Sequence, residues 1–156
     1  MTLTGIRRRP AVVLAVLLLA TVPARAATPA SPIGRWLTQD GSGVIDIESC
    51  GGASLCGRIV GVTLDHPDEA MPADYQGHPQ CMLTIIRDML SDGSGWMGQI
   101  EDPRDGTIYD ASMRLDAQHR LRLRGFIGIP LFGQTQVWTA YAGPVASDCR
   151  LQPRSR

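Results

Sequence analysis

The sequence predicts an all-β protein, an eight-stranded antiparallel up-and-down barrel. Segments that alternate apolar and polar residues recur along the chain, and clusters of turn-forming residues separate them at regular spacing. No segment shows a convincing helical period. Closure removes the exposed edges of such a sheet, and eight strands leave an interior that side chains fill or that holds one small ligand.

The stretch from Trp96 to Trp138 forms the centre of the predicted barrel and is expected to contain four strands. Its first turn is Pro103-Arg104-Asp105-Gly106, because proline suits the first central position of a type I turn and glycine accepts the positive φ that closes it. A four-residue loop at this point fixes which residues face each other and share the inner face. The predicted inward pairs are Ile100 with Tyr109, Gly98 with Ala111, and Trp96 with Met113.

The following strand, residues 120–124, alternates arginine and leucine without error, which is typical of a strand with one buried face. Pairing apolar residues with apolar residues requires an odd-numbered loop centred on Gln118. An even-numbered loop would bury arginines against Met113 and Leu115, and burial of unpaired charge is costly. The predicted pairs are Leu115 with Leu121, Met113 with Leu123, and Ala111 with Gly125.

Three small residues therefore lie side by side on the inner face of adjacent strands: Gly98, Ala111 and Gly125. Such a row can form the wall of a ligand pocket. It can also let the sheet coil sharply, or make room for a large ring such as that of Trp36. We favour the structural interpretation, because small barrels need glycine at their bends.

Four further strands are expected before this region, at residues 34–37, 44–48, 55–62 and 82–90. In the second of them Ile45 and Ile47 alternate with acidic residues and are predicted to face the core. The last strand of the barrel, residues 134–141, is ambiguous. Either Val137 or Trp138 could point inward.

Two loops are unusual. Residues 63–80 form a long irregular segment with several carboxylates and two histidines, and we expect a solvated acidic lid; a metal site is the alternative, although the spacing matches no known motif. Residues 128–133, Gly-Ile-Pro-Leu-Phe-Gly, form an apolar loop. We expect this loop to cap the barrel. Alternatively, it could contact a partner or line the mouth of a pocket.

The first 26 residues are predicted to be a secretory signal peptide. Arg7-Arg8-Arg9 precedes an apolar run, and Ala24-Arg25-Ala26 fits the cleavage pattern. The apolar run is too short for a membrane span, so the mature protein is expected to have no transmembrane span and to be periplasmic or secreted after cleavage near Ala26. The expected divisions are a flexible lead-in at 27–32, a barrel domain at 33–142 and a C-terminal tail at 143–156. Apart from Cys149, this tail is expected to lie in solvent.

Four cysteines, Cys50, Cys56, Cys81 and Cys149, remain after the signal peptide. An even count in an exported protein indicates two disulfides, with three possible connectivities. Cys50 and Cys56 flank a short turn and could bridge a hairpin, which would leave the other two cysteines to pin the C-terminal tail. Zinc binding is the alternative, but no Cys-x-x-Cys motif is present.

Charge and motifs argue against several classes of function. Without the signal peptide the chain keeps eleven arginines against fifteen acidic residues, a net charge of −4, and nothing resembles a basic stripe, so nucleic acid is not expected as a partner. The sequence contains neither G-x-S-x-G nor HExxH. Glu101 and Asp110 are predicted to face outward, where acid–base catalysis is not expected. We therefore predict no enzyme activity, no catalytic residue, no cofactor and no metal.

Several strings resemble domain of unknown function 2147, a family of exported bacterial proteins. These strings are residues 50–59, 96–100, 102–103, 106–109, 123–125, 128–131 and 133–139. Gly34-x-Trp36, followed by eight strands, resembles the opening motif of lipocalins. The resemblance to the family implies a lipocalin-like barrel and an envelope location, and it implies no established activity. The chain departs from the family at Glu101 and Ala140. Ala140 stands where the family often has arginine, and such a late arginine commonly packs over the first-strand tryptophan of lipocalin-like barrels. Arg124 is the substitute that we consider for this contact with Trp36.

The function expected from these features is the binding of a small, mainly apolar molecule in the barrel cavity. The residues predicted to line the cavity are Trp36, Gly98, Tyr109, Met113 and Gly125. The alternative is a non-catalytic interaction or structural protein of the envelope, whose barrel is filled by its own side chains.

Overall fold

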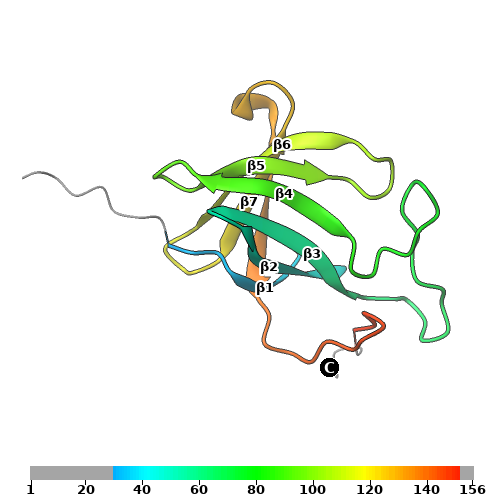
Figure 1. Cartoon of the computed structure of the whole chain (residues 1–156). Coiled ribbons are helices and arrows are strands. Elements are labelled where there is room, and N and C mark those ends of the chain that lie inside the picture. Colours follow the sequence, from blue (N-terminus) through cyan, green and yellow to red (C-terminus); the bar gives the residue numbers. More distant parts are fainter. Residues whose placement is uncertain (1–29, 152–156) are drawn as a thin grey trace, which may run out of the picture.

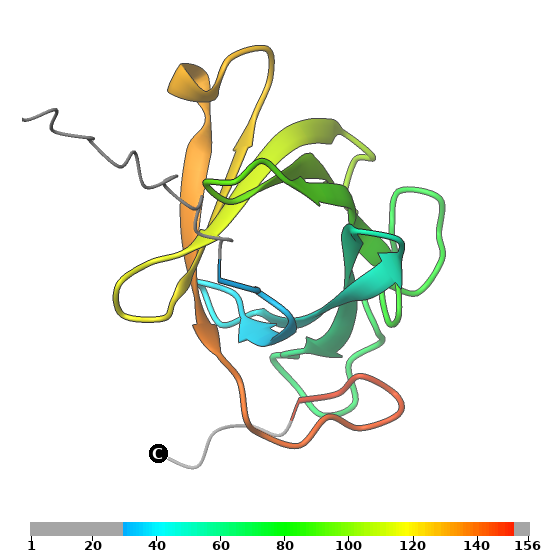
Figure 2. The ribbon, with the colours of Figure 1, turned by 60° about the vertical axis from the view of Figure 1, so that its left-hand side comes forward.

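The structure, a computed structural model, describes residues 30–151, and the predicted signal peptide lies outside this range. Eight strands form a closed barrel in which each strand pairs with the next and β8 returns to β1 (Figures 1 and 2). The strands are β1 Gly34–Leu37, β2 Gly43–Gly51, β3 Ser54–Val62, β4 Thr84–Ser91, β5 Trp96–Glu101, β6 Ile108–Leu115, β7 Leu121–Phe126 and β8 Gln134–Ala140. A short 3-10 helix, η1, spans Pro130–Phe132. The predicted fold class is confirmed.

The register of β5, β6 and β7 is the predicted one. Gly98 pairs with Ala111, and Ala111 pairs with Gly125, so the three small residues form one row across the sheet. The β6–β7 loop also has the predicted odd length, because Leu115 pairs with Leu121. The cost of burying arginine was therefore a correct guide to the register.

In β8, Trp138 and not Val137 faces the interior. Trp138 pairs with Leu121, which is fully buried, and is itself 2% exposed. This pairing places Gln134 and Gln136 on the inner face as well, because alternate residues of a strand point to the same side.

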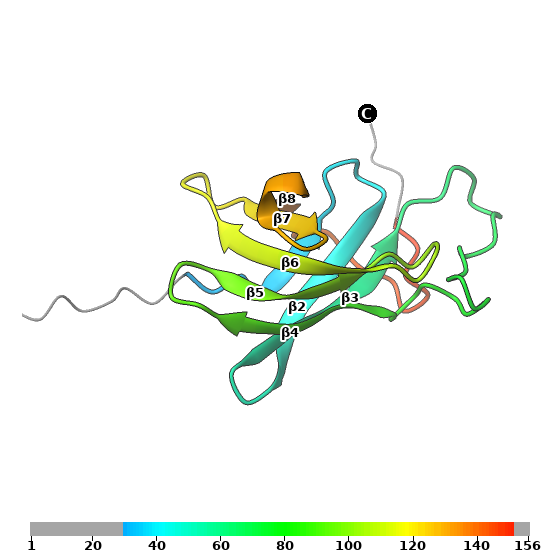
Figure 3. The same cartoon turned by 90° about the horizontal axis from the view of Figure 1, so that it is seen from above.

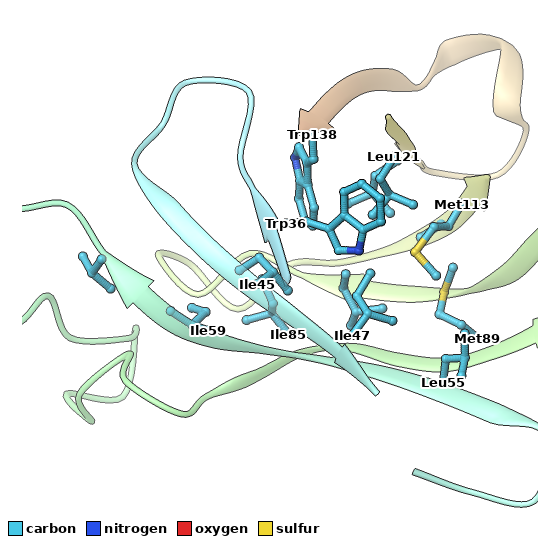
Figure 4. Close-up of a cluster of buried hydrophobic side chains, with 14 residues drawn as sticks. Trp36, Ile45, Ile47, Leu55, Ile59, Ile85, Met89, Met113, Leu121 and Trp138 are labelled. Atoms are coloured by element: carbon cyan, nitrogen blue, oxygen red, sulfur yellow. The ribbon is translucent and has the colours of Figure 1, made fainter. Parts of the chain in front are cut away.

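One end of the barrel, which we call the base, is closed by the lead-in and two tryptophans. Trp36 and Trp138 lie close together there, beside Leu121 (Figure 4). Pro32 is almost completely buried, and its carbonyl oxygen accepts a hydrogen bond from Trp36 Nε1 at 2.8 Å. The opposite end, the mouth, carries the β5–β6 turn and the long loop between β3 and β4 (Figure 3).

Of the three possible connectivities, the disulfides have the one in which the first pair bridges a hairpin and the second pair attaches the tail. Cys50 is bonded to Cys56, and Cys81 to Cys149. Of the tail, which was expected to lie in solvent apart from Cys149, residues 149–151 instead pair with the end of β3, whereas residues 146–148 are exposed. Val62 N–H donates to the carbonyl oxygen of Cys149, and Leu151 N–H donates back to that of Val62.

The β3–β4 loop, expected to be a solvated lid, is attached to the body at several points. Arg150 donates to the carbonyl oxygens of Pro67 and Glu69, each at 2.8 Å. Tyr75 N–H donates to the carbonyl oxygen of Pro103 in the β5–β6 turn. Leu64, Met71 and Leu83 pack against the core, so only part of the segment is solvated.

Candidate functional site

The base half of the barrel interior is filled by side chains. Trp36 is 6% exposed and Met113 is 1% exposed, and both belong to the continuous hydrophobic core. Met89, fully buried, points toward Met113 across the interior (Figure 4). Two of the five predicted cavity residues, Trp36 and Met113, are therefore part of the packed core.

Two members of the small-residue row, Gly98 and Ala111, face occupied space. A Cβ added at Gly98 would lie 2.6 Å from Met89 Sδ and 2.6 Å from the carbonyl oxygen of Arg87. Ala111 is fully buried. At Gly98 the side chain that uses the space is Met89 and not Trp36, the ring considered from the sequence.

Gly125, the third member of the row, is less crowded than Gly98. A Cβ added there would lie 3.7 Å from Ile100 Cγ2, 3.7 Å from Tyr109 Cβ and 4.0 Å from Tyr109 Cγ, all at ordinary van der Waals contact. Gly125, Tyr109 and Ile100 are all half-buried. Tyr109 and Gly125 are thus the two predicted residues that lie together where the interior approaches the mouth.

Sequence reasoning missed the two glutamines of β8. Gln134 pairs with Gly125 and Gln136 with Leu123, so both face inward, yet both are exposed. The cause is the shortness of β1, which pairs with β8 only through Ala140 and Thr139. The first half of β8 has no strand on that side, and this opens the wall beside the glutamines. Knowing that Trp138 faces inward would have been enough to place them.

The polar atoms of this region differ in how they are satisfied. Gln136 Oε1 accepts a hydrogen bond from Trp138 Nε1 at 2.7 Å, which fixes the carboxamide against the base-end tryptophan. Trp96 faces inward nearer the base, opposite the buried Met113, and its Nε1 is buried without a hydrogen-bond partner among residues 30–151. A buried indole N–H ordinarily has an acceptor, so Trp96 marks a position where one is missing.

The carboxylates considered as catalytic candidates lie on the outer face. Glu101 accepts a hydrogen bond from Arg87 Nη1 at 2.5 Å, and Asp110 pairs with Gln99 on the same face. Within residues 30–151 no charged residue is buried as a whole, and no group of three potential metal ligands occurs. The inward-facing groups that remain are apolar, aromatic and amide.

Arg124 does not pack over Trp36, the role considered for it from the family resemblance. It lies on the outer face of β7, opposite Ser112. Its Nε donates to the carbonyl oxygen of Pro130 at 2.7 Å, and its Nη2 to that of Leu131 at 3.2 Å. These bonds hold the β7–β8 loop on the outer side of the barrel, from which it projects, and the loop does not cap the barrel.

Two depressions lie outside the barrel wall. One, of about 620 Å³, lies between the β1–β2 turn and the outer side of β8, next to Tyr141 and Leu151. The other, of about 480 Å³, lies on the outer side of β5 to β8 and contains Arg114, Arg122 and Arg124. No helix in residues 30–151 is long and apolar enough to cross a membrane.

Comparison with known proteins agrees with this architecture. The structure is similar to protein HP1028 from Helicobacter pylori, described as belonging to the lipocalin family, with a TM-score of 0.58 and 11% sequence identity over 72% of this chain and 84% of that one. At that identity the similarity shows the fold alone. No curated protein matches the sequence. The sequence model of the family described as "Uncharacterized protein conserved in bacteria (DUF2147)" matches residues 34–140, more than half of the chain, and the protein belongs to this family.

Proposed function

We propose that the protein binds a small, mainly apolar molecule in the mouth half of its barrel. The observation that carries the proposal is the exposure of Gln134 and Gln136, which face inward but remain open to solvent beside Gly125. An inward-facing residue is exposed only where the interior is accessible, so this side of the barrel offers an entrance.

The surroundings of the entrance define the ligand class. Ile100, Tyr109 and Gly125 provide mainly apolar surface, and Gln134, the cross-strand partner of Gly125, adds a carboxamide from the β8 wall. No charged residue faces inward on the strands that line it, so a neutral ligand is favoured. Apolar walls with a few placed polar groups are typical of small-molecule sites and support binding over catalysis.

The principal test is titration with a neutral apolar fluorophore, N-phenyl-1-naphthylamine, followed by its emission. Gly125→Leu places a large side chain against Ile100 and Tyr109 and is expected to reduce uptake roughly tenfold or more. Ser112→Leu is the matched control, since it adds the same group to the outer face of the neighbouring strand β6. Equal uptake by the wild type and a folded Gly125→Leu variant would overturn the proposal.

Native mass spectrometry of protein purified from its own cells, before and after solvent extraction, would identify a natural ligand. The same preparation tests the proposed periplasmic or secreted location, which the two disulfides support. The mature protein is expected to begin at Ala27, and N-terminal sequencing checks this.

A second candidate is an interaction protein of the envelope with no ligand. Its support is the packed base half of the barrel, together with the exposed apolar residues of the β7–β8 loop. This candidate predicts no fluorophore uptake and no extractable mass.

A further inference from the structure

The arginines of residues 30–151 fall into two groups. Six of them form an ion pair with a carboxylate: Arg35, Arg58, Arg87, Arg104, Arg120 and Arg150. The remaining three, Arg114, Arg122 and Arg124, have no carboxylate partner within this range. All three lie on the outer face of β6 and β7 and line the same groove, of about 480 Å³.

The placement of these arginines is unfavourable for the isolated barrel. Arg114 and Arg122 are direct cross-strand partners, and like charges in that position destabilise a sheet. The carboxylate in the groove lining, that of Asp92, is engaged in its own turn, where it accepts hydrogen bonds from Ser94 and Gly95. The groove is thus positively charged, although the chain without its signal peptide has a net charge of −4.

An exposed apolar lip borders this groove. It consists of Ile127, Ile129, Leu131 and Phe132, with exposed fractions of 69%, 52%, 76% and 78%. Figure 2 shows the loop and η1 projecting from the barrel at the end of the β7–β8 hairpin. Arg124 joins the two features, because its guanidinium lies in the groove and holds the carbonyl oxygens of Pro130 and Leu131. The lip is therefore held in place while its side chains face water.

We propose that this face docks on an anionic phospholipid bilayer. The lip enters the interfacial layer of the bilayer, and Arg114 and Arg122 bind lipid phosphates in the groove behind it. Apolar side chains flanked by arginine are the composition that interfacial binding requires, because burial of apolar surface and attraction to anionic headgroups add to each other. Phosphate oxygens also relieve the repulsion between the two facing arginines. This role is independent of ligand binding inside the barrel.

Co-sedimentation of the mature protein with vesicles tests the proposal. Vesicles of phosphatidylcholine and phosphatidylglycerol in equal parts are compared with vesicles of phosphatidylcholine alone. We expect the protein to bind the anionic vesicles roughly tenfold or more strongly than vesicles of phosphatidylcholine alone. We expect this binding to weaken as salt is added.

Two double variants separate the contributions. Leu131→Ser with Phe132→Ser removes the centre of the lip, and Arg114→Gln with Arg122→Gln removes the free charges; each is expected to reduce binding roughly tenfold. Arg35→Gln with Arg58→Gln is the matched charge control, because these arginines are ion-paired and lie on β1 and β3. Leu90→Ser is the apolar control, since Leu90 is 53% exposed on β4. Both controls are expected to bind as the wild type does, and circular dichroism confirms that each variant is folded.

Three results would overturn the proposal. The first is equal binding, or none, to the two kinds of vesicle. The second is an equal loss of binding in the arginine control, which would indicate adsorption by general charge. The third is a self-association that sedimentation velocity detects without lipid and that the lip variant abolishes, since the lip would then be an interface between two copies of the chain.

Discussion

Trp36 donates its indole N–H to the carbonyl oxygen of Pro32 at 2.8 Å, and this bond fastens the lead-in beneath the base of the barrel. Both partners are buried, so within residues 30–151 the carbonyl would be left without a donor if the indole were replaced. Trp36→Phe is expected to lower the free energy of unfolding by about 1–3 kcal/mol, through the unsatisfied carbonyl and the smaller ring. Urea unfolding followed by far-UV circular dichroism measures the change, and an unchanged midpoint would show that Pro32 is not held by this bond.

The two disulfides are expected to contribute unequally to stability. Cys81–Cys149 closes a separation of 68 residues and Cys50–Cys56 closes only 6. From loop-closure entropy, losing the long-range bond costs about 4 kcal/mol and losing the short one about 2 kcal/mol. Cys81→Ser with Cys149→Ser should therefore lower the urea midpoint more than Cys50→Ser with Cys56→Ser. The reverse order would mean that strain or residual structure in the unfolded chain outweighs the entropy.

Arg124→Met is expected to release the β7–β8 loop without unfolding the barrel. The variant keeps the aliphatic stem but removes the donors to Pro130, Leu131 and Thr135. Hydrogen–deuterium exchange should rise in residues 127–133 and remain unchanged in β2 and β3, while the free energy of unfolding falls by about 1–2 kcal/mol. Arg122→Met is the control, because Arg122 lies on the same face and makes no hydrogen bond to residues 127–133. Equal exchange in the two variants would contradict the assigned role of Arg124.

The free energy of unfolding should decrease at acidic pH, because protonation removes the charge of carboxylates that hydrogen-bond to arginine. The hydrogen bond from Arg120 lowers the pKa of Asp116 below 3.8, and that from Arg104 lowers the pKa of Asp102 in the same way. Because the folded-state pKa is the lower one, the stabilisation is complete above the unfolded pKa. It is lost as the pH falls below 3.8 through the folded-state values. Urea unfolding between neutral pH and about pH 2 should show this decline, and Asp102→Asn with Asp116→Asn should flatten it. An equally steep decline in that variant would assign the acid sensitivity to other groups.

The faces of the central strands could be predicted because burial of arginine is costly. Arg120, Arg122 and Arg124 alternate with leucines, and a register shifted by one residue would bury guanidinium groups. In β8 the sequence Gln-Thr-Gln-Val-Trp-Thr carries an apolar residue on each face, so local pattern did not decide between Val137 and Trp138. The pairing with Leu121 decided it, and that is a tertiary contact.

The errors at the candidate site also have tertiary causes. Gly98 was correctly placed in the small-residue row, but the flexible Met89 from β4 occupies the space in front of it, and no local pattern specifies where methionine points. The apolar loop after Ile127 was expected to cap the barrel. It turns outward because Arg124 binds its carbonyl oxygens, an interaction between side chain and backbone that hydrophobic patterning does not report.

Trp96→Phe is expected to behave in the opposite way to Trp36→Phe. The Trp96 indole N–H is buried with no acceptor among residues 30–151, so its removal should leave the free energy of unfolding within about 1 kcal/mol of the wild type. Because Trp96 lies opposite Met113 in the filled base half, away from the proposed mouth site, the same variant should take up N-phenyl-1-naphthylamine as the wild type does. Urea unfolding and titration with the fluorophore measure the two properties separately. A loss of stability as large as that of Trp36→Phe would mean that the Trp96 indole N–H contributes a hydrogen bond to the fold.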